Sequence, residues 1–156
     1  SSHFWNMFIV DALLGNFDRH NGNWGFLVDV NTQETSIAPI YDCGSCLLPQ
    51  ADEKIMKAVL TNEDELNARI YQFPTSAVKM NGKKINYHDF ITACSYEECN
   101  NALLRIVPRI DIDGICSFID SIGELSELQK LFYKKYIVNR YKKILLVAYE
   151  KLNTHS

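Results

Sequence analysis

The stretch Asn16-Phe17-Asp18-Arg19-His20-Asn21-Gly22-Asn23 is where the chain becomes chemically specific. Asp18 and Asn23 lie five positions apart in a polar loop that contains a glycine. A catalytic loop for phosphoryl transfer uses an Asp and an Asn at this spacing: the Asp takes up the proton of the substrate hydroxyl, and the Asn holds a metal ion. By itself the spacing is a weak signal, because polar loops often contain it by chance.

The segment after this loop predicts a β-hairpin. Residues 24–30 alternate large apolar side chains with others, which suits a strand with one buried face. Residues 31–35 are polar and typical of a turn, and residues 36–41 are apolar enough to run back as a second strand. A turn centred on Gln33 pairs residues whose numbers sum to 66.

That hairpin would bring a second acidic side chain to the loop. With a turn centred on Gln33, Asp42 lies opposite Trp24 and beside Asn23. Opposed residues of antiparallel strands sit about 4.5–5.5 Å apart, and Mg²⁺ takes oxygen ligands at about 2.0–2.1 Å. One Mg²⁺ could therefore bridge the amide oxygen of Asn23 and the carboxylate of Asp42.

Three motifs together resemble the HipA family of bacterial serine/threonine kinases, over roughly residues 4–48. They are Leu13-Leu14-Gly15-Asn16-Phe17-Asp18-Arg19-His20, Asn23-Trp24-Gly25-Phe26 and Ala38-Pro39-Ile40-Tyr41-Asp42-Cys43-Gly44-Ser45. The resemblance implies that Asp18 is the catalytic base and that Asn23 and Asp42 bind Mg²⁺, with ATP as the phosphoryl donor. Asp42 would take the place of the Asp in the Asp-Phe-Gly motif of other protein kinases. It also implies a toxin–antitoxin setting with an antitoxin partner, autophosphorylation and translation-linked targets.

Two further residues of the loop have roles that the sequence leaves open. His20 follows Asp18, whereas other kinases place a His before the catalytic Asp, so that role cannot be transferred. As a catalytic residue it would position the phosphoryl group, and otherwise it would brace the loop. Arg19 could pair with Asp42, with a phosphate or with a phosphorylated loop.

Composition describes an ordinary soluble protein of about one domain. The chain has 156 residues, 47% hydrophobic and 22% charged, with a net charge of −3 that gives no general attraction to nucleic acid or anionic membranes. No apolar run reaches the roughly 18–20 residues that span a bilayer. We therefore expect a cytoplasmic protein, with its five cysteines as free thiols. Cys43 and Cys46 fit Cys-x-x-Cys but have no partner pair for zinc.

Most of the remaining chain is predicted to be helical. Residues 4–14 are apolar nearly all round, as in a buried helix, and Gly15 provides its stop. Asp11 within it would either bond to loop backbone or face water. Further helices are expected at 52–60, at 63–71, from Ser95 to about residue 107, from Asp111 or Asp113 to about 123, and from Ser126 to about 152. Ser95 and Ser126 each fit a capping box.

Two groups of basic residues allow a binding role. Asn81-Gly82 predicts a tight hairpin, and its Lys79, Lys83 and Lys84 could touch phosphate, although solvated turn charges are favoured. The final helix carries Lys130, Lys134, Lys135, Arg140, Lys142, Lys143 and Lys151. With Tyr133, Tyr136 and Tyr149 as stacking groups it could bind nucleic acid, but a solvated face on a core-packed helix is the favoured interpretation. Its predicted apolar stripe runs through Leu131, Ile137, Val138, Tyr141, Ile144, Leu145, Ala148 and Leu152.

Expected motifs for gripping the nucleotide are absent from the sequence. It contains no Gly-x-Gly-x-x-Gly, no Walker motif and no Val-Ala-x-Lys strand. We therefore predict a single domain over residues 1–156 that is mainly α, with a small β-hairpin at the active site. It corresponds to the C-terminal lobe of a HipA-like kinase whose N-terminal lobe is missing, so isolated activity should be slight. The alternatives are a non-catalytic kinase-like module that binds protein or nucleic acid, and a small-molecule phosphotransferase.

Overall fold

The computed structural model describes residues 2–15, 53–72, 75–76 and 78–154, together with the backbone of residues 27–28 and 37–38. The helices are α1 (Ser2–Leu14), α2 (Glu53–Thr61), α3 (Glu63–Asn67), η2 (Ala68–Gln72), α4 (Tyr87–Ala93), α5 (Glu97–Ile106), η3 (Val107–Arg109), α6 (Ile112–Ser121), α7 (Glu127–Arg140), η4 (Tyr141–Leu146) and α8 (Val147–Thr154). The strands are β1 (Leu27–Val28), β2 (Ile37–Ala38), β3 (Lys79–Met80) and β4 (Lys83–Lys84). The fold is mainly helical, as predicted.

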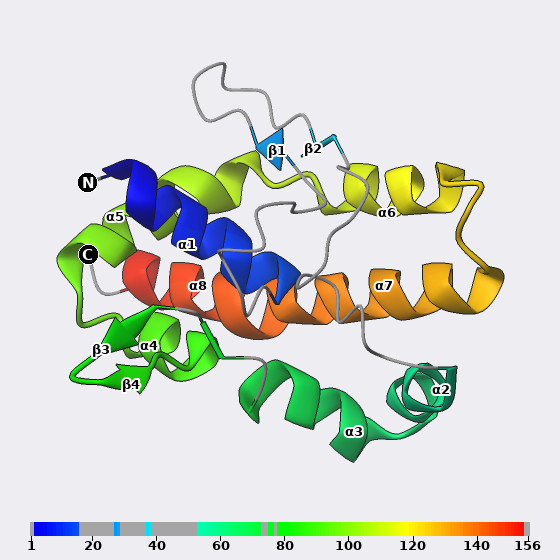
Figure 1. Cartoon of the computed structure of the whole chain (residues 1–156). Coiled ribbons are helices and arrows are strands. Elements are labelled where there is room, and N and C mark those ends of the chain that lie inside the picture. Colours follow the sequence, from blue (N-terminus) through cyan, green and yellow to red (C-terminus); the bar gives the residue numbers. More distant parts are fainter. Residues whose placement is uncertain are drawn as a thin grey trace.

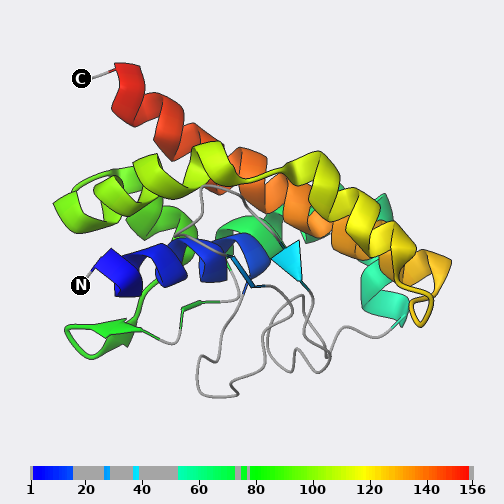
Figure 2. The ribbon, with the colours of Figure 1, turned by 90° about the horizontal axis from the view of Figure 1, so that it is seen from above.

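The last three helices form one continuous rod to which the others attach. In Figure 1 α7, η4 and α8 run on from one another through the length of the molecule, from orange to red. Ser126 and Gln129 form the predicted capping box at its start. Helices α1, α2, α4 and α6 all contact this rod, and α5 packs along α1. Figure 2 shows α5 and α6 lying along the rod in the view from above.

Helix α1 is the centre of the hydrophobic core, as its sequence predicts. From Trp5 to Leu14 every side chain except Met7 is buried. Its side chains pack against aromatic residues of α4: the rings of Trp5 and Phe90 are stacked, and the rings of Phe8 and Tyr87 lie 5.3 Å apart. Gly15 follows with a φ of +65°, the left-handed conformation that ends helices. The predicted glycine stop is confirmed.

The two hairpins have different outcomes. Asn81 and Gly82 adopt φ values of 55° and 80°, and β3 pairs with β4 around them as predicted. In the first hairpin Leu27 pairs with Ala38 and Val28 with Ile37, so the paired numbers sum to 65. The predicted sum of 66 is wrong by one residue. The polar turn at 31–35 has no Asn-Gly pair to fix the register, so its centre could not be read from the sequence.

The predicted cap of one helix needs correction. The capping box at Ser95 does not form: α5 begins at Glu97, its N-cap is Tyr96, and no side chain caps it. Glu98, the acid expected to close the box, instead accepts a hydrogen bond of 3.1 Å from the indole of Trp5. Of the two candidate caps of α6, Asp111 and Asp113, it is Asp111 that accepts a hydrogen bond from the N–H of Gly114.

The predicted apolar stripe of the last helix is correct only in its second half. Ile137, Ile144, Leu145 and Ala148 are buried, but Leu131 is 54% exposed. The face that α7 turns to the core carries Phe132, Tyr136 and Arg140 instead. Apolar periodicity missed these positions because one member of the buried face is charged. Among the described residues, no helix combines the length and the apolar character needed to cross a membrane.

Candidate functional site

The residues predicted for catalysis and metal binding lie outside the part of the chain that the structure describes. These are Asp18, His20, Asn23 and Asp42, together with Arg19 and the Cys43–Cys46 pair. The described elements nearest to them in sequence are α1, which ends at Leu14, and the paired strands β1 (Leu27–Val28) and β2 (Ile37–Ala38). Among the described residues no group of His, Cys, Asp and Glu could hold a metal ion.

The exit of α1 lies against a buried polar cluster, which we define as Asp11, Tyr87, Tyr136 and Arg140. All four side chains are buried, and Arg140 and Tyr136 are 0% exposed. Nε of Arg140 donates to the carbonyl of Ala12 at 2.7 Å, and Nη1 donates to the carbonyl of Arg69 at 2.8 Å. The guanidinium therefore joins the last turn of α1 to η2.

Two tyrosine rings enclose the guanidinium of Arg140. Its carbon lies 5.6 Å from the ring centre of Tyr87 and 5.5 Å from that of Tyr136, within the range of cation–π attraction. Burial raises the pKa of Tyr136, while the charge of Arg140 acts against that rise. Burial and the carboxylate of Asp11 raise the pKa of Tyr87 well above its ordinary value. Both tyrosines are therefore neutral at physiological pH. Asp11 is buried, so the alternative in which it faces water is wrong.

Gly15 is required by the close approach of this cluster. A Cβ at Gly15 would overlap the hydroxyl of Tyr136. Neither that hydroxyl nor Nη2 of Arg140 makes a regular hydrogen bond, although both atoms are buried. Buried polar atoms without partners are rare in folded proteins and call for an explanation. The first residue after α1 thus packs directly on Tyr136 of α7.

The basic residues of the last helix mostly contact neighbouring helices. Lys134 forms an ion pair of 2.7 Å with Asp120 of α6, Lys135 donates to the carbonyl of Leu60 at the end of α2, and Lys143 lies 3.1 Å from Asn67 of α3. The favoured interpretation, a solvated face on a core-packed helix, therefore holds only in part, because these three lysines also bind groups of neighbouring helices. Tyr136, one of the suggested stacking groups, is inaccessible to any base.

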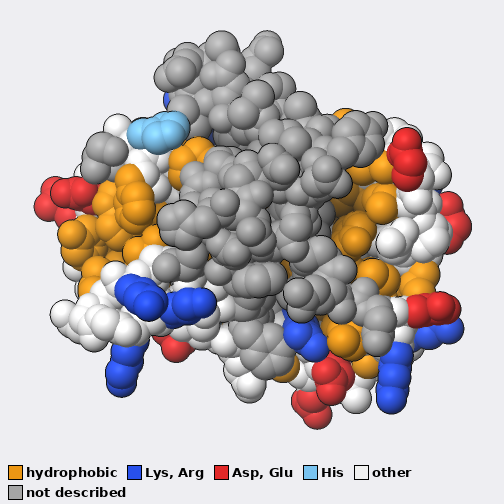
Figure 3. All heavy atoms as spheres, viewed as in Figure 1, with side chains coloured by type: hydrophobic (Ala, Val, Ile, Leu, Met, Phe, Trp, Pro, Cys, Tyr) orange, Lys and Arg blue, Asp and Glu red, His pale blue; other side chains and the backbone are white. Residues whose placement is uncertain are grey.

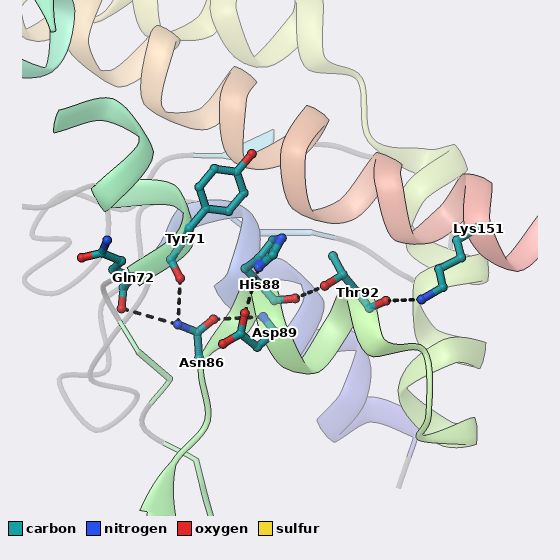
Figure 4. Close-up of polar contacts among 7 residues, drawn as sticks. All are labelled: Tyr71, Gln72, Asn86, His88, Asp89, Thr92 and Lys151. Carbon is teal, nitrogen blue, oxygen red and sulfur yellow. Dashed lines mark hydrogen bonds and ion pairs between the residues drawn. The ribbon is translucent and has the colours of Figure 1, made fainter. Parts of the chain in front are cut away.

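A second polar network lies around α4 and is structural. Figure 4 shows Nδ2 of Asn86 pointing to the carbonyls of Tyr71 and Gln72, while its Oδ1 caps Asp89 at the start of α4. At the other end of α4, Lys151 donates to the carbonyl of Thr92. These bonds tie η2, α4 and α8 together. The pairing of His88 with Asp89 at 3.0 Å belongs to this network.

The hairpin β3–β4 presents charge to solvent. Lys79, Lys83 and Lys84 are all exposed, as expected for solvated turn charges. In Figure 3 blue side chains stand out at the lower left, where Figure 1 places this hairpin. The free thiols expected from the sequence are confirmed for Cys94, Cys99 and Cys116.

Sequence reasoning did not identify Tyr136 and Arg140 as residues that contact the end of α1. Arg140 was counted among the surface cations, although it stands three and four residues from Ile137, Tyr136 and Ile144 on one helical face. That spacing was the available signal. A lone arginine within an apolar stripe indicates a buried charge with specific partners.

Comparison with known proteins identifies relatives among kinases. The chain is 56% identical over 149 residues to the serine/threonine-protein kinase CtkA of Helicobacter pylori strain J99, covering 95% of this chain and 46% of that protein. It also matches the crystal structure of the proinflammatory kinase CtkA of Helicobacter pylori with a TM-score of 0.82 and 54% identity. That match covers 99% of this chain and 56% of the crystallised chain. No protein-family model matches. The chain therefore spans about half the length of these relatives.

Proposed function

We propose that this chain is the C-terminal catalytic lobe of a serine/threonine protein kinase related to the HipA family, which transfers phosphate from Mg²⁺·ATP to a Ser or Thr hydroxyl. The observation that carries the proposal is the 56% identity to a serine/threonine-protein kinase over 95% of the chain. Because the chain corresponds to only 46% of that kinase, the glycine-rich loop and the phosphate-binding lysine are assigned to a separate N-terminal lobe.

In this proposal three residues divide the chemistry. Asp18 orients the acceptor hydroxyl and takes up its proton as the oxygen attacks the γ-phosphorus, whose bond to the β–γ bridging oxygen breaks to release ADP. Asn23 and Asp42 hold Mg²⁺, which neutralises charge on the phosphates when it is bound. His20 is assigned to the same loop, either next to the phosphoryl group or as a brace. Little covalent work is asked of the protein, so positioning decides the rate.

The donor set fits magnesium. A carboxylate and an amide oxygen are hard ligands of the kind that Mg²⁺ prefers. In the observed register of β1 and β2 the paired numbers sum to 65, and positions 23 and 42 have the same sum. We take this numerical agreement as support for assigning both residues to one metal ion.

The structure at the end of α1 supports the role that we propose for Asp18. Helix α1 is buried and ends at Leu14, and Gly15 packs against Tyr136 three residues before Asp18. A loop that starts from a rigid, buried helix end can hold a catalytic group more precisely than one that starts from a surface helix. A protein substrate, an antitoxin partner and a cytoplasmic location remain predictions that accompany this proposal.

The test is a chimera in which this chain replaces the matching segment of CtkA, so that the other half of the kinase is supplied. We expect the chimera to transfer ³²P from labelled ATP to serine or threonine of protein, and the chain alone to transfer little. Asp42→Asn should abolish transfer while leaving the circular dichroism spectrum unchanged.

A matched control is Asp113→Asn, which makes the same chemical change at an exposed position of the first turn of α6. This control should transfer phosphate at the unmodified rate. A folded chimera without transfer, or an Asp42→Asn chimera with undiminished transfer, would refute the proposal.

A further inference from the structure

Burying the charged side chain of Arg140 in the core costs free energy that a hydrophobic residue at this position would not cost. It is fully buried, and its Nε and Nη1 donate hydrogen bonds to backbone carbonyls, those of Ala12 and Arg69. Its Nη2 has no regular partner. Taking a charge out of water is costly, and a hydrophobic side chain of similar volume often serves stability as well or better. The arginine must therefore supply something other than stability.

What an arginine supplies, and a methionine does not, is a rigid planar fork of donors. Nε and Nη1 of Arg140 bind carbonyls from elements that are far apart in sequence. The guanidinium also lies over the rings of Tyr87 and Tyr136. The positions of the two carbonyls are thereby fixed relative to α7. The carbonyl of Ala12 is one of the last four of α1, which have no obligatory partner within the helix.

The same face of α7 also fixes the residue at which the chain leaves α1. Tyr136 stands one helical turn before Arg140, and its hydroxyl fills the space that a side chain at residue 15 would need. Arg140 therefore binds the last turn of α1, and Tyr136 lies against Gly15. Asp18 follows only three residues later.

We infer that Arg140, together with Tyr136, is a positioning residue for the loop that carries Asp18, acting by fixing the last turn of α1 and Gly15 in place. Its catalytic consequence rests on the proposed kinase function, whereas its effect on the end of α1 does not. Neither residue touches the reacting groups in this inference. A displacement of about 1 Å in a catalytic group is enough to lower a reaction rate by about a hundredfold.

The first measurement is amide hydrogen exchange in this chain, which needs no enzymatic activity. In Arg140→Met, exchange at Leu14 and Gly15 should accelerate at least about tenfold relative to exchange at Ile9 in the middle of the same helix. Arg140→Lys keeps a cationic donor group, so its exchange rates at Leu14 and Gly15 should lie between those of Arg140→Met and those of the unaltered chain. Ile115→Val, which trims a buried side chain of α6, is the control for general destabilisation and should not accelerate the end of α1 selectively.

The second measurement is steady-state kinetics in the CtkA chimera. Arg140→Met should lower kcat about a hundredfold with the KM for ATP changed less than about twofold, because an interaction that acts on the reacting geometry alone has been lost. Arg140→Lys should recover part of kcat, and Ile115→Val should leave kcat unchanged. Should Arg140→Met fail to fold, Arg140→Lys and Tyr136→Phe carry both measurements, with faster exchange at Gly15 and a lower kcat expected.

The outcomes separate this inference from the proposed function. Unchanged relative exchange at Leu14 and Gly15 in the folded variants overturns the positioning role, whatever the kinase assay gives. Uniformly faster exchange with an unchanged kcat overturns it as well, because Arg140 would then only stabilise the fold. An inactive chimera with the unaltered chain refutes the kinase proposal, and the exchange data still decide whether Arg140 fixes the end of α1.

Discussion

Nε of Arg140 in α7 lies 2.7 Å from the carbonyl oxygen of Ala12 in the last turn of α1, so this hydrogen bond joins two helices across 128 residues of sequence. Most of the contact between α1 and the remaining chain is hydrophobic and could tolerate small shifts. A hydrogen bond from a buried guanidinium is directional and short, and it fixes one point of the helix. This bond therefore joins α7 to the last turn of α1, close in sequence to the motif that begins at Asn16.

Gly15→Ala tests the close approach at this root. A side chain in the left-handed region costs about 1–2 kcal/mol, and the new Cβ would also overlap the hydroxyl of Tyr136. We expect a loss of at least about 2 kcal/mol in the free energy of unfolding, measured by urea denaturation. Adding Tyr136→Phe should restore part of that loss, because it removes the overlapping atom. Gly123→Ala is the matched control, since nothing lies within 4 Å of its Cβ, and it should be nearly neutral.

The sequence predicted helices and turns where local chemistry alone determines them. Asn81-Gly82 specifies its hairpin because a type I′ turn needs positive φ at both central residues. The turn at 31–35 carries no such signal, and its register came out one residue away from the expected one. The α1 helix and its glycine stop were equally readable, since an all-round apolar segment can only be buried.

Tertiary contacts decided the features that the sequence did not reveal. Ser95 and Glu98 have the right spacing for a capping box, but Glu98 bonds to Trp5, which is 93 residues away. Arg140 is buried because Ala12 and Arg69 offer carbonyls to it, and neither neighbour is predictable from the local pattern. Periodicity treats every arginine as a surface residue, so the buried one was counted with the exposed cations.

A pair of serine substitutions tests the two capping boxes directly. Oγ of Ser126 accepts a hydrogen bond from the N–H of Gln129 at 3.1 Å, and Oε1 of Gln129 accepts one from the N–H of Ser126 at 2.8 Å. Ser126→Ala should cost about 1 kcal/mol in unfolding free energy. Ser95→Ala should change it by less than about 0.5 kcal/mol, because Ser95 caps nothing. Equal losses for the two variants in urea denaturation would contradict the observed start of α5.

Cys99 should make stability fall at alkaline pH. Burial raises the pKa of its thiol from 9.0 to about 12, with the nearby Cys94 adding to the rise. Below pH 9.0 the thiol is protonated in both the folded and the unfolded chain, so its full contribution to the free energy of unfolding is present. Between the two values the unfolded chain loses the proton and the folded chain keeps it, so rising pH favours unfolding by up to about 1.4 kcal/mol per pH unit.

Urea denaturation at a series of pH values from about 8 to 10.5 measures this slope. Cys99→Ala should make the slope shallower, whatever it does to stability at neutral pH. Cys116→Ala is the comparison, because Cys116 is only half-buried, and its removal should alter the slope less. A slope that is the same in the unaltered chain and in Cys99→Ala would show that the thiol titrates normally in the folded state.

Substituting the two proposed acids separately should give different signatures in the CtkA chimera, because they act on different partners. Asp42→Asn weakens a metal ligand, so the rise in melting temperature with Mg²⁺·ATP should shrink together with phosphoryl transfer. Asp18→Asn removes the base and leaves the metal ligands, so the rise should remain while transfer falls by at least about a hundredfold. Replacing Mg²⁺ by EDTA should remove the rise in both variants and in the unaltered chimera. If Asp18→Asn abolished nucleotide-dependent stabilisation and Asp42→Asn preserved it, the two roles would have to be exchanged.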